Sequence, residues 1–218
     1  MLFFLTPFLL SVYIAVSVRV GTMLGDDDPE AAKLSVRLSM QLALVVAIAV
    51  GGVFYLLRDY IALLYTDQKK VIEETATYVP IVALDFVISS FSYVLQGVLE
   101  GGGKPERATG AAIVGNWIVG VAALFALSHY LGNDAPTIDE QRRIKLQALW
   151  WGVVAGEVVK MLLLLLFVLK LNWAQLAEEA IARAELEEAE DDEAVERFTR
   201  MLGEREPLLI NDRPNKVR

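Results

Sequence analysis

The sequence predicts an all-α, polytopic membrane protein of about five membrane-spanning helices, followed by an acidic tail that is helical or disordered. Its 218 residues are 55% hydrophobic with a mean hydropathy of +0.45, high for a soluble domain. The apolar residues form uncharged blocks of about 20 residues, which is the length that crosses a bilayer. Most of the net negative charge lies in the tail. Residues 171–218 carry 13 Asp/Glu and 7 Lys/Arg, which is −6 of the chain's net charge of −8.

This composition excludes several classes of function. A nucleic-acid-binding protein needs a basic face, and here the excess charge is acidic and lies in the tail. The absence of cysteine excludes disulfides and thiolate metal sites without identifying a compartment. We find no nucleophile–base pair, no phosphate-binding loop and no metal motif, so we predict no catalytic residues, no metal and no cofactor, and do not expect an enzyme.

The first two spans are expected at about 1–24 and 36–57. The chain has no charge from Met1 to Val18, and it lacks the basic start and the small-residue cleavage site of a signal peptide. Glycines can release the first helix at Gly21 and Gly25. Proline at position 29 can open the next helix, where its missing N–H costs nothing.

The third predicted span, about 76–99, carries a carboxylate at its middle. A charge at the bilayer centre costs about 3 kcal/mol on insertion scales. Counting by helical turns from Asp85 gives other polar residues on the same face: Tyr78, Ser89, Ser92 and Gln96. This polar stripe must therefore face a partner helix or an aqueous cavity.

Two further spans are expected at about 108–132 and 146–170. The last contains Glu157 and Lys160, whose spacing of three allows them to neutralise each other inside the membrane. Two pairs of glycines have the spacing that allows membrane helices to approach closely: Gly97 with Gly101 and Gly152 with Gly156. Six Lys/Arg lie near membrane ends on each side, so the charge rule gives no orientation.

The acidic tail, residues 171–218, has helical periodicity from Trp173 to Leu202. Beyond it, Glu204 precedes Leu208 and Leu209 in the pattern of an acidic dileucine signal, which clathrin adaptors read as an address to endosomes, lysosome or vacuole. A chance Leu-Leu pair in a loose tail is the alternative.

Three segments together resemble the multidrug and toxic compound extrusion (MATE) transporters. They are SVRVGTMLGDDDPEAAKLS, VLQGVLEGGGKPERATGA and LWWGVVAG, and they occur in the order and spacing of that family. The resemblance covers about Val16 to Trp173 and corresponds to the last five of the family's twelve helices. It implies a partial second lobe, with the tail and the loop between the first two spans in the cytosol.

The chain also departs from the family pattern. The family's acidic residue in the third span would fall at Ser89, whereas this chain has Asp85 one turn earlier on the same face. Lys160 replaces a glutamine of the last helix, and Glu157 replaces an apolar residue. These shifts leave open whether the coupling ion is H⁺ or Na⁺.

The candidate residues of a substrate and cation pathway each have a structural alternative. Asp85 is either a carboxyl that exchanges protons in a cavity or a static group in a helix-packing hydrogen bond or a salt bridge, for instance to Lys160. Ser89, Ser92 and Gln96 fit a pathway or interhelical hydrogen bonds equally well. Glu157 and Lys160 fit a gating pair or a static pair. Asn116 and Trp117 occupy the place of two family tyrosines and fit a cavity wall or plain packing.

We therefore predict an incomplete MATE-like antiporter that exports organic cations, drugs or metabolites in exchange for protons or sodium. Its partners would be the lipid bilayer, a small organic substrate and a missing N-terminal lobe, with clathrin adaptors on the tail. The protein would be multi-pass, in a vacuolar, lysosomal or endosomal membrane or otherwise in the plasma membrane. The alternative is a non-transporting protein or regulatory fragment that binds partner membrane helices.

Overall fold

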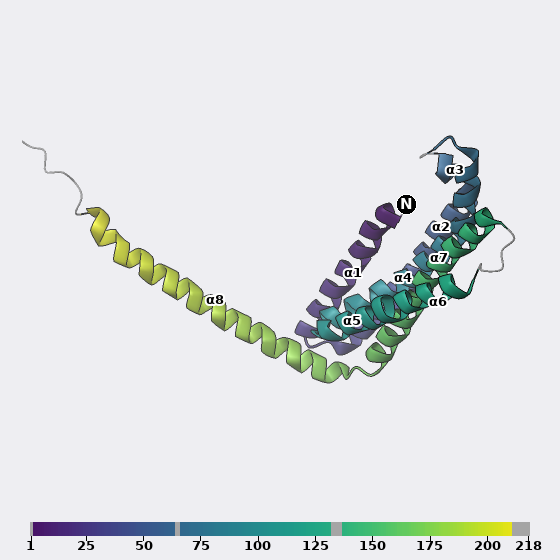
Figure 1. Ribbon diagram of the computed structural model, residues 1–218. Coiled ribbons are helices and arrows are strands. Elements are labelled where there is room, and N and C mark those ends of the chain that lie inside the picture. The colour runs from purple at the N-terminus through teal and green to yellow at the C-terminus, as the bar shows by residue number, and fades with distance from the viewer. Residues whose placement is uncertain (1, 64–65, 132–136, 211–218) are drawn as a thin grey trace, which may run out of the picture.

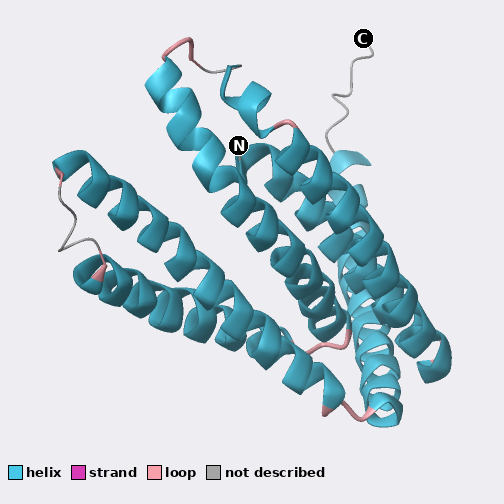
Figure 2. Cartoon of the chain, turned by 90° about the vertical axis from the view of Figure 1, so that its right-hand side faces the viewer, coloured by secondary structure: helices cyan, strands magenta, loops and turns pink. Residues whose placement is uncertain are grey.

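The computed structural model describes residues 2–63, 66–131 and 137–210, with side chains throughout except at 2–6, 59, 62, 70 and 202–210. Figure 2 shows helices joined by short loops, and these described residues contain no strand. The elements, labelled in Figure 1, are α1 (Leu2–Gly25), α2 (Pro29–Leu56), α3 (Arg58–Leu63), α4 (Lys69–Gly101), α5 (Pro105–Ala112), η1 (Ile113–Gly120), α6 (Val121–Tyr130), α7 (Ile138–Leu169) and α8 (Trp173–Ile210).

Five segments are long and apolar enough to cross a membrane, which confirms the expected number of spans. They are Pro7–Gly25, Pro29–Leu56, Val71–Gly101, Pro105–Tyr130 and Ile138–Leu169. α5, η1 and α6 follow one another without a break and form the fourth span together. Several helices begin earlier than the predicted spans, because a helix continues into water where charged residues end the apolar run.

The turn between α1 and α2 follows the local sequence. α1 ends at Gly25, and Asp27 adopts a left-handed conformation with φ of 56°. The backbone N–H of Ala31 donates to Oδ1 of Asp28 at 2.9 Å, so Asp28 caps α2, whose first residue is Pro29. The turn is thus fixed by capping chemistry close to where the sequence predicts it.

α4 is the central helix of the bundle. It packs against α1, α2, α3 and α7, and 56% of its membrane-spanning window is buried inside the protein. α1 approaches it closely, because a Cβ on Gly97 would lie only 2.7 Å from the carbonyl oxygen of Tyr13. The main core lies around this contact and includes Val20, Leu24, Val94, Val98, Leu99 and Leu164.

α7 is held against the fourth span by a second glycine contact. A Cβ on Gly152 would lie 2.7 Å from Cα of Leu124 in α6. The neighbouring part of the fourth span, η1, is a π-helix, a rare geometry that is frequent at functional sites. Both glycine pairs predicted from their spacing are therefore points of close helix packing.

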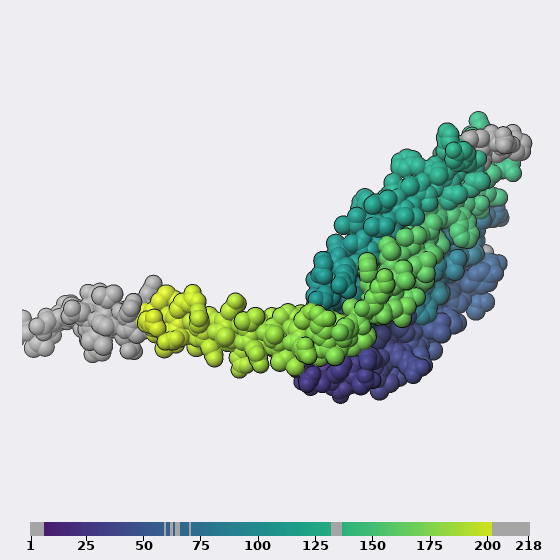
Figure 3. All heavy atoms as spheres, turned by 90° about the horizontal axis from the view of Figure 1, so that it is seen from below, coloured from purple at the N-terminus to yellow at the C-terminus, as the bar shows by residue number. Residues whose placement is uncertain are grey.

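α8 leaves the lower end of the bundle and runs away from it (Figure 1). Its first turns are anchored by Leu176 and Ala177, which are buried in the main core. Seen from below, this part lies against the end of the bundle formed by α1, and the following turns, in yellow-green, project as a rod (Figure 3). The tail is therefore helical as far as Ile210, beyond the limit suggested by its periodicity.

Candidate functional site

A buried ion pair lies on the face of α7 that is turned towards α4. Nζ of Lys160 is 2.7 Å from Oε1 of Glu157, and the two residues are only 5% and 6% exposed. The ammonium also lies 5.4 Å from the ring centroid of Tyr93 in α4, within the range of a cation–π interaction. Lys160 thus joins α7 to α4.

Asp85 adds a second carboxylate to this pair. It is 7% exposed, lies in α4, and is within electrostatic range of both Glu157 and Lys160. Its Oδ1 has no hydrogen-bond donor in the described part of the chain. When all three groups are ionised, the buried cluster of Asp85, Glu157 and Lys160 carries two negative charges and one positive charge.

Close backbone packing positions Lys160 in this cluster. A Cβ on Gly115 of η1 would lie 2.6 Å from Cβ of Lys160 and 2.7 Å from its backbone nitrogen. Cβ of Lys160 therefore packs directly against η1, and the ammonium extends towards α4. A larger residue than glycine at position 115 would displace it.

The MatE family model matches residues 1–125 of the chain. The chain belongs to the MATE family. Protein DETOXIFICATION 16 of Arabidopsis thaliana is 30% identical over 184 residues, which are 84% of this chain and 35% of that protein. Multidrug and toxin extrusion protein 1 of Homo sapiens is 27% identical over 173 residues, which are 79% of this chain and 28% of that protein.

A solved structure supports the fold assignment. The crystal structure of the eukaryotic MATE transporter AtDTX14 matches with a TM-score of 0.71 at 24% identity, over 82% of this chain and 38% of that chain. This MATE-family chain therefore spans about a third of the length of the relatives it matches. Family membership and five apolar helices make it an integral, multi-pass membrane protein.

The remaining residues of the polar stripe continue along α4 of this MATE-family chain. Ser89 and Ser92 are buried, and Gln96 is half-buried. The Ser92 hydroxyl donates to the carbonyl oxygen of Ile88 at 3.3 Å, so its hydrogen bond stays within the helix. At the other end of the stripe, the Tyr78 hydroxyl donates to the carbonyl oxygen of Arg143 in α7 at 3.5 Å.

Asn116 and Trp117 lie in η1 and point outward. Both residues are exposed, Trp117 to 74%. The structure therefore does not gather them with Asp85, and their role in a pathway stays a prediction. The three residues that it does bring together from the predicted set are Asp85, Glu157 and Lys160.

Tyr93 is a member of the site that the sequence reasoning missed. It lies four residues after Ser89 and eight after Asp85, so helical spacing places it on the same face. Its ring meets Tyr13 of α1 edge to face at 6.4 Å between centroids. Counting one helical turn on from Ser89 would have identified it.

Two further predictions concern metals and the tail. Among residues 2–63, 66–131 and 137–210, the structure shows no group of three or more His, Cys, Asp or Glu side chains placed to hold a metal ion.

Glu204, Leu208 and Leu209 lie in the last part of the α8 backbone, but their side chains are outside the described ones. The sorting signal stays a prediction.

Proposed function

We propose that the chain acts as one lobe of a secondary active transporter that exports organic cations, drugs or metabolites in exchange for protons or sodium. The observation that supports this function is Asp85, a buried second carboxylate beside a complete ion pair in the middle of a membrane span. Ionisable residues inside membrane spans are rare and typically mark ion or substrate pathways.

The charge of the cluster defines what it can bind. Glu157 and Lys160 neutralise each other, so the ionised Asp85 leaves one uncompensated negative charge in a region of low dielectric constant. A buried charge without a partner is costly, and one proton or one sodium ion at Asp85 would remove that cost. The cluster therefore favours a single monovalent cation.

The same cluster links cation binding to helix packing. Asp85 and Tyr93 belong to α4, whereas Glu157 and Lys160 belong to α7. Neutralising Asp85 relieves its repulsion by the Glu157 carboxylate across the α4–α7 contact, and this repulsion outweighs its attraction to the Lys160 ammonium. Binding of the coupling ion would therefore change the relative stability of two arrangements of these helices, which antiport requires.

Alternating access needs two bundles that move against each other around a central site. Five spans offer one wall of such a cavity, and the matched relatives are about three times as long as the matched region. We propose that a first lobe completes the transporter and that the substrate binds between the lobes. The chain alone would then bind the coupling ion without transporting.

The proposal is tested with the protein reconstituted in vesicles together with a first lobe. Asp85→Asn keeps the shape of the side chain and removes its charge, and we expect it to abolish efflux driven by a proton or sodium gradient while the protein remains folded. Asp26→Asn, in the exposed α1–α2 turn, is the matched control and should leave efflux unchanged. Undiminished efflux by the Asp85 variant would show that this residue does not bind the coupling ion.

A second candidate function is a non-transporting protein that binds partner membrane helices. The observation in its favour is that α1 and α2 expose many large apolar side chains, among them Ile14, Val18, Leu42, Val45 and Ile48. A regulator of this kind would co-purify with a complete transporter, and its effect would not depend on Asp85. Sensitivity to Asp85→Asn therefore separates the two candidates.

The proposed location is an endosomal, lysosomal or vacuolar membrane, with the tail in the cytosol where clathrin adaptors would read the dileucine pattern. Replacing Leu208 and Leu209 with alanine in a fluorescently tagged protein should move it to the plasma membrane. Replacing Leu202 alone is the matched control. An unchanged location of the double variant would exclude the signal.

A further inference from the structure

A basic cavity lies at the end of the bundle from which α8 departs. Its volume is about 130 Å³, and it opens where the α4–α5 turn meets the junction of α7 and α8. Three cationic side chains line it, those of Lys104, Arg107 and Lys170, against one carboxylate, that of Glu179. The lining therefore carries an excess of two positive charges.

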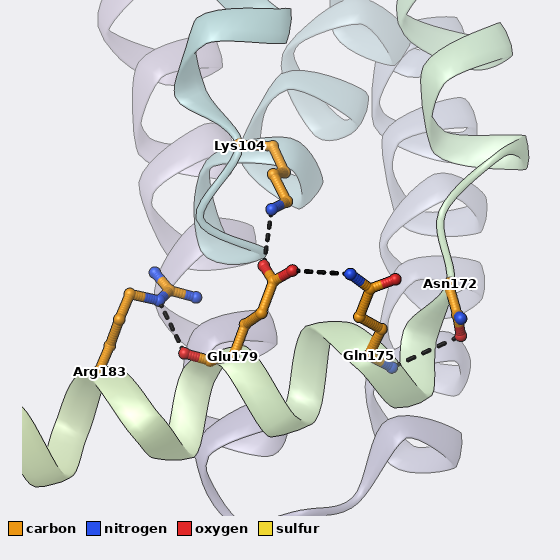
Figure 4. A network of polar contacts seen from close by, with 5 residues as sticks. All are labelled: Lys104, Asn172, Gln175, Glu179 and Arg183. Atoms are coloured by element: carbon orange, nitrogen blue, oxygen red, sulfur yellow. Dashed lines mark hydrogen bonds and ion pairs between the residues drawn. The ribbon is translucent and has the colours of Figure 1, made fainter.

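Part of this charge is already paired. Nζ of Lys104 lies 2.6 Å from Oε2 of Glu179, while the side-chain amide of Gln175 donates to Oε1 of Glu179 at 3.0 Å (Figure 4). Both oxygens of Glu179 are thereby occupied. Arg107 and Lys170 form no ion pair within the described part of the chain, so their charges are uncompensated.

The packing of α8 on the α4–α5 turn forms one side of the cavity. Leu176 of α8 is buried directly against the α4–α5 turn, where a Cβ on Gly102 would lie 2.6 Å from its Cδ2. Arg183 donates from Nε to the carbonyl oxygen of Glu179 at 3.1 Å, and its guanidinium covers Gly103, whose φ is 70° (Figure 4). These contacts anchor the first turns of α8 beside Lys104, which lines the cavity.

The depth of the cavity indicates what can occupy it. The third span ends at Gly101, the fourth begins at Pro105 and the fifth ends at Leu169, so all three ends border the cavity. This is the level at which lipid headgroups lie. Basic pockets between membrane helices at this level bind anionic headgroups, and the positive end of the fourth span's helix dipole adds to the attraction.

We propose that the cavity lined by Lys104, Arg107 and Lys170 binds a phosphate group, supplied at this depth by an anionic phospholipid. Arg107 and Lys170 would contact the phosphate oxygens, whereas Glu179 would compete with the phosphate for Lys104. A lipid is favoured over free phosphate because the exposed side chain of Leu169, next to Lys170, offers apolar surface for an acyl chain. A bound headgroup would tie the base of α8 to the α4–α5 turn.

The test uses the full chain in lipid nanodiscs and measures retained phosphatidic acid against phosphatidylcholine by native mass spectrometry. With about 1 kcal/mol per basic residue near a membrane surface, Arg107→Gln and Lys170→Gln should each lower the preference for phosphatidic acid about fivefold, and together about twenty-fivefold. Lys33→Gln, at the same end of the bundle but paired with Glu30, is the matched control. It should leave the preference unchanged.

Glu179→Gln should change the preference for phosphatidic acid in the opposite direction. It frees Lys104 from its ion pair, and we expect a preference for phosphatidic acid about fivefold higher, with only a small fall in melting temperature because the pair is partly exposed. An effect of the double Arg107/Lys170 variant no larger than that of Lys33→Gln, or a lower preference in the Glu179 variant, would overturn the proposal.

Inorganic phosphate, added to the lipid-free protein in detergent, distinguishes the two sources of the group. Weak binding, sensitive to the same substitutions, together with strong retention of phosphatidic acid supports the lipid site. Equal binding of inorganic phosphate and phosphatidic acid would overturn the assignment to a lipid.

Discussion

Gly115 in η1 and Gly156 in α7 pack backbone against backbone: a Cβ on Gly115 would lie 2.7 Å from the carbonyl oxygen of Gly156, and one on Gly156 would lie 2.8 Å from that of Gly115. Neither neighbour is a flexible side chain that could move aside. The contact therefore sets the distance between the two helices. It also holds the backbone of Lys160, one turn beyond Gly156, at the cluster with Asp85 and Glu157.

Replacing Gly156 with alanine should destabilise the protein by about 1–3 kcal/mol, because the added methyl group overpacks a backbone contact. Gly110→Ala is the control, since a Cβ there would meet nothing within 4 Å and alanine is the better helix former. Thermal unfolding in detergent checks the difference. Equal melting temperatures for the two variants would contradict the packing described.

Lys160→Met should be the most disruptive substitution within the charged cluster. It leaves Asp85 and Glu157 as two buried carboxylates without a cation, and breaking a buried pair costs about 3–5 kcal/mol. Glu157→Gln should cost less, because Asp85 remains to balance the ammonium.

The double variant Lys160→Met/Glu157→Gln should recover part of the loss, since it removes both members of the pair. The check is thermal unfolding of the three variants side by side at neutral pH. A double variant no more stable than Lys160→Met alone would show that the charges do not interact as the structure indicates.

The contact between α8 and the bundle should depend on pH. The hydrogen bond from Lys104 lowers the pKa of Glu179 below its ordinary value of 4.5. The carboxylate therefore stabilises the docked helix at every pH above that value, and this contribution is lost as the pH falls through the lowered pKa. Because Glu179 is partly exposed, the effect should be small.

Spin labels at the exposed positions Glu106 and Ala182 provide the measurement. Their distance should be constant from neutral pH down to about the ordinary glutamate pKa and broaden below it. In Glu179→Gln the distance should not respond to pH. A response that persisted in this variant would assign the pH dependence to another group.

Asp28→Ala should lower the stability of the α1–α2 turn by about 1 kcal/mol, because it removes the side chain that accepts from the Ala31 N–H at the start of α2. Asp28→Asn keeps an accepting oxygen and should be close to neutral. Asp26→Ala, two residues away, tests the effect of charge alone. Chemical denaturation of the three variants in detergent ranks them.

The sequence predicted the features that depend on local patterns. Uncharged runs gave the number of spans, and the spacing of Glu157 and Lys160 gave the ion pair, since residues three apart on a helix are neighbours. The helix ends were less accurate. α4 begins at Lys69, outside the predicted span, because charged residues end a membrane segment without ending a helix.

The features that the sequence could not predict depend on which helix faces which. Nothing in the third span alone indicates that Asp85 lies beside the ion pair of α7 rather than facing α1 or α2. The π-helical geometry of η1 is another example, since it accompanies the backbone contacts of Gly115 and Gly120 with α7. The cavity at Lys104 is formed by two stretches far apart in the sequence, 104–107 and 170–179, and leaves no continuous motif.

The length of α8 has a mechanical consequence. Its 38 residues correspond to a rod of about 57 Å at the rise of an α-helix. Among its described side chains, those that fix it to the bundle lie in the first turns and include Leu176, Ala177 and Glu179, which pairs with Lys104. From Glu179 to Ile210 the helix runs about 47 Å, so a tilt of about 10° at this pivot would swing the far tip by about 8 Å. Small rearrangements among the spans are therefore amplified far from the bilayer.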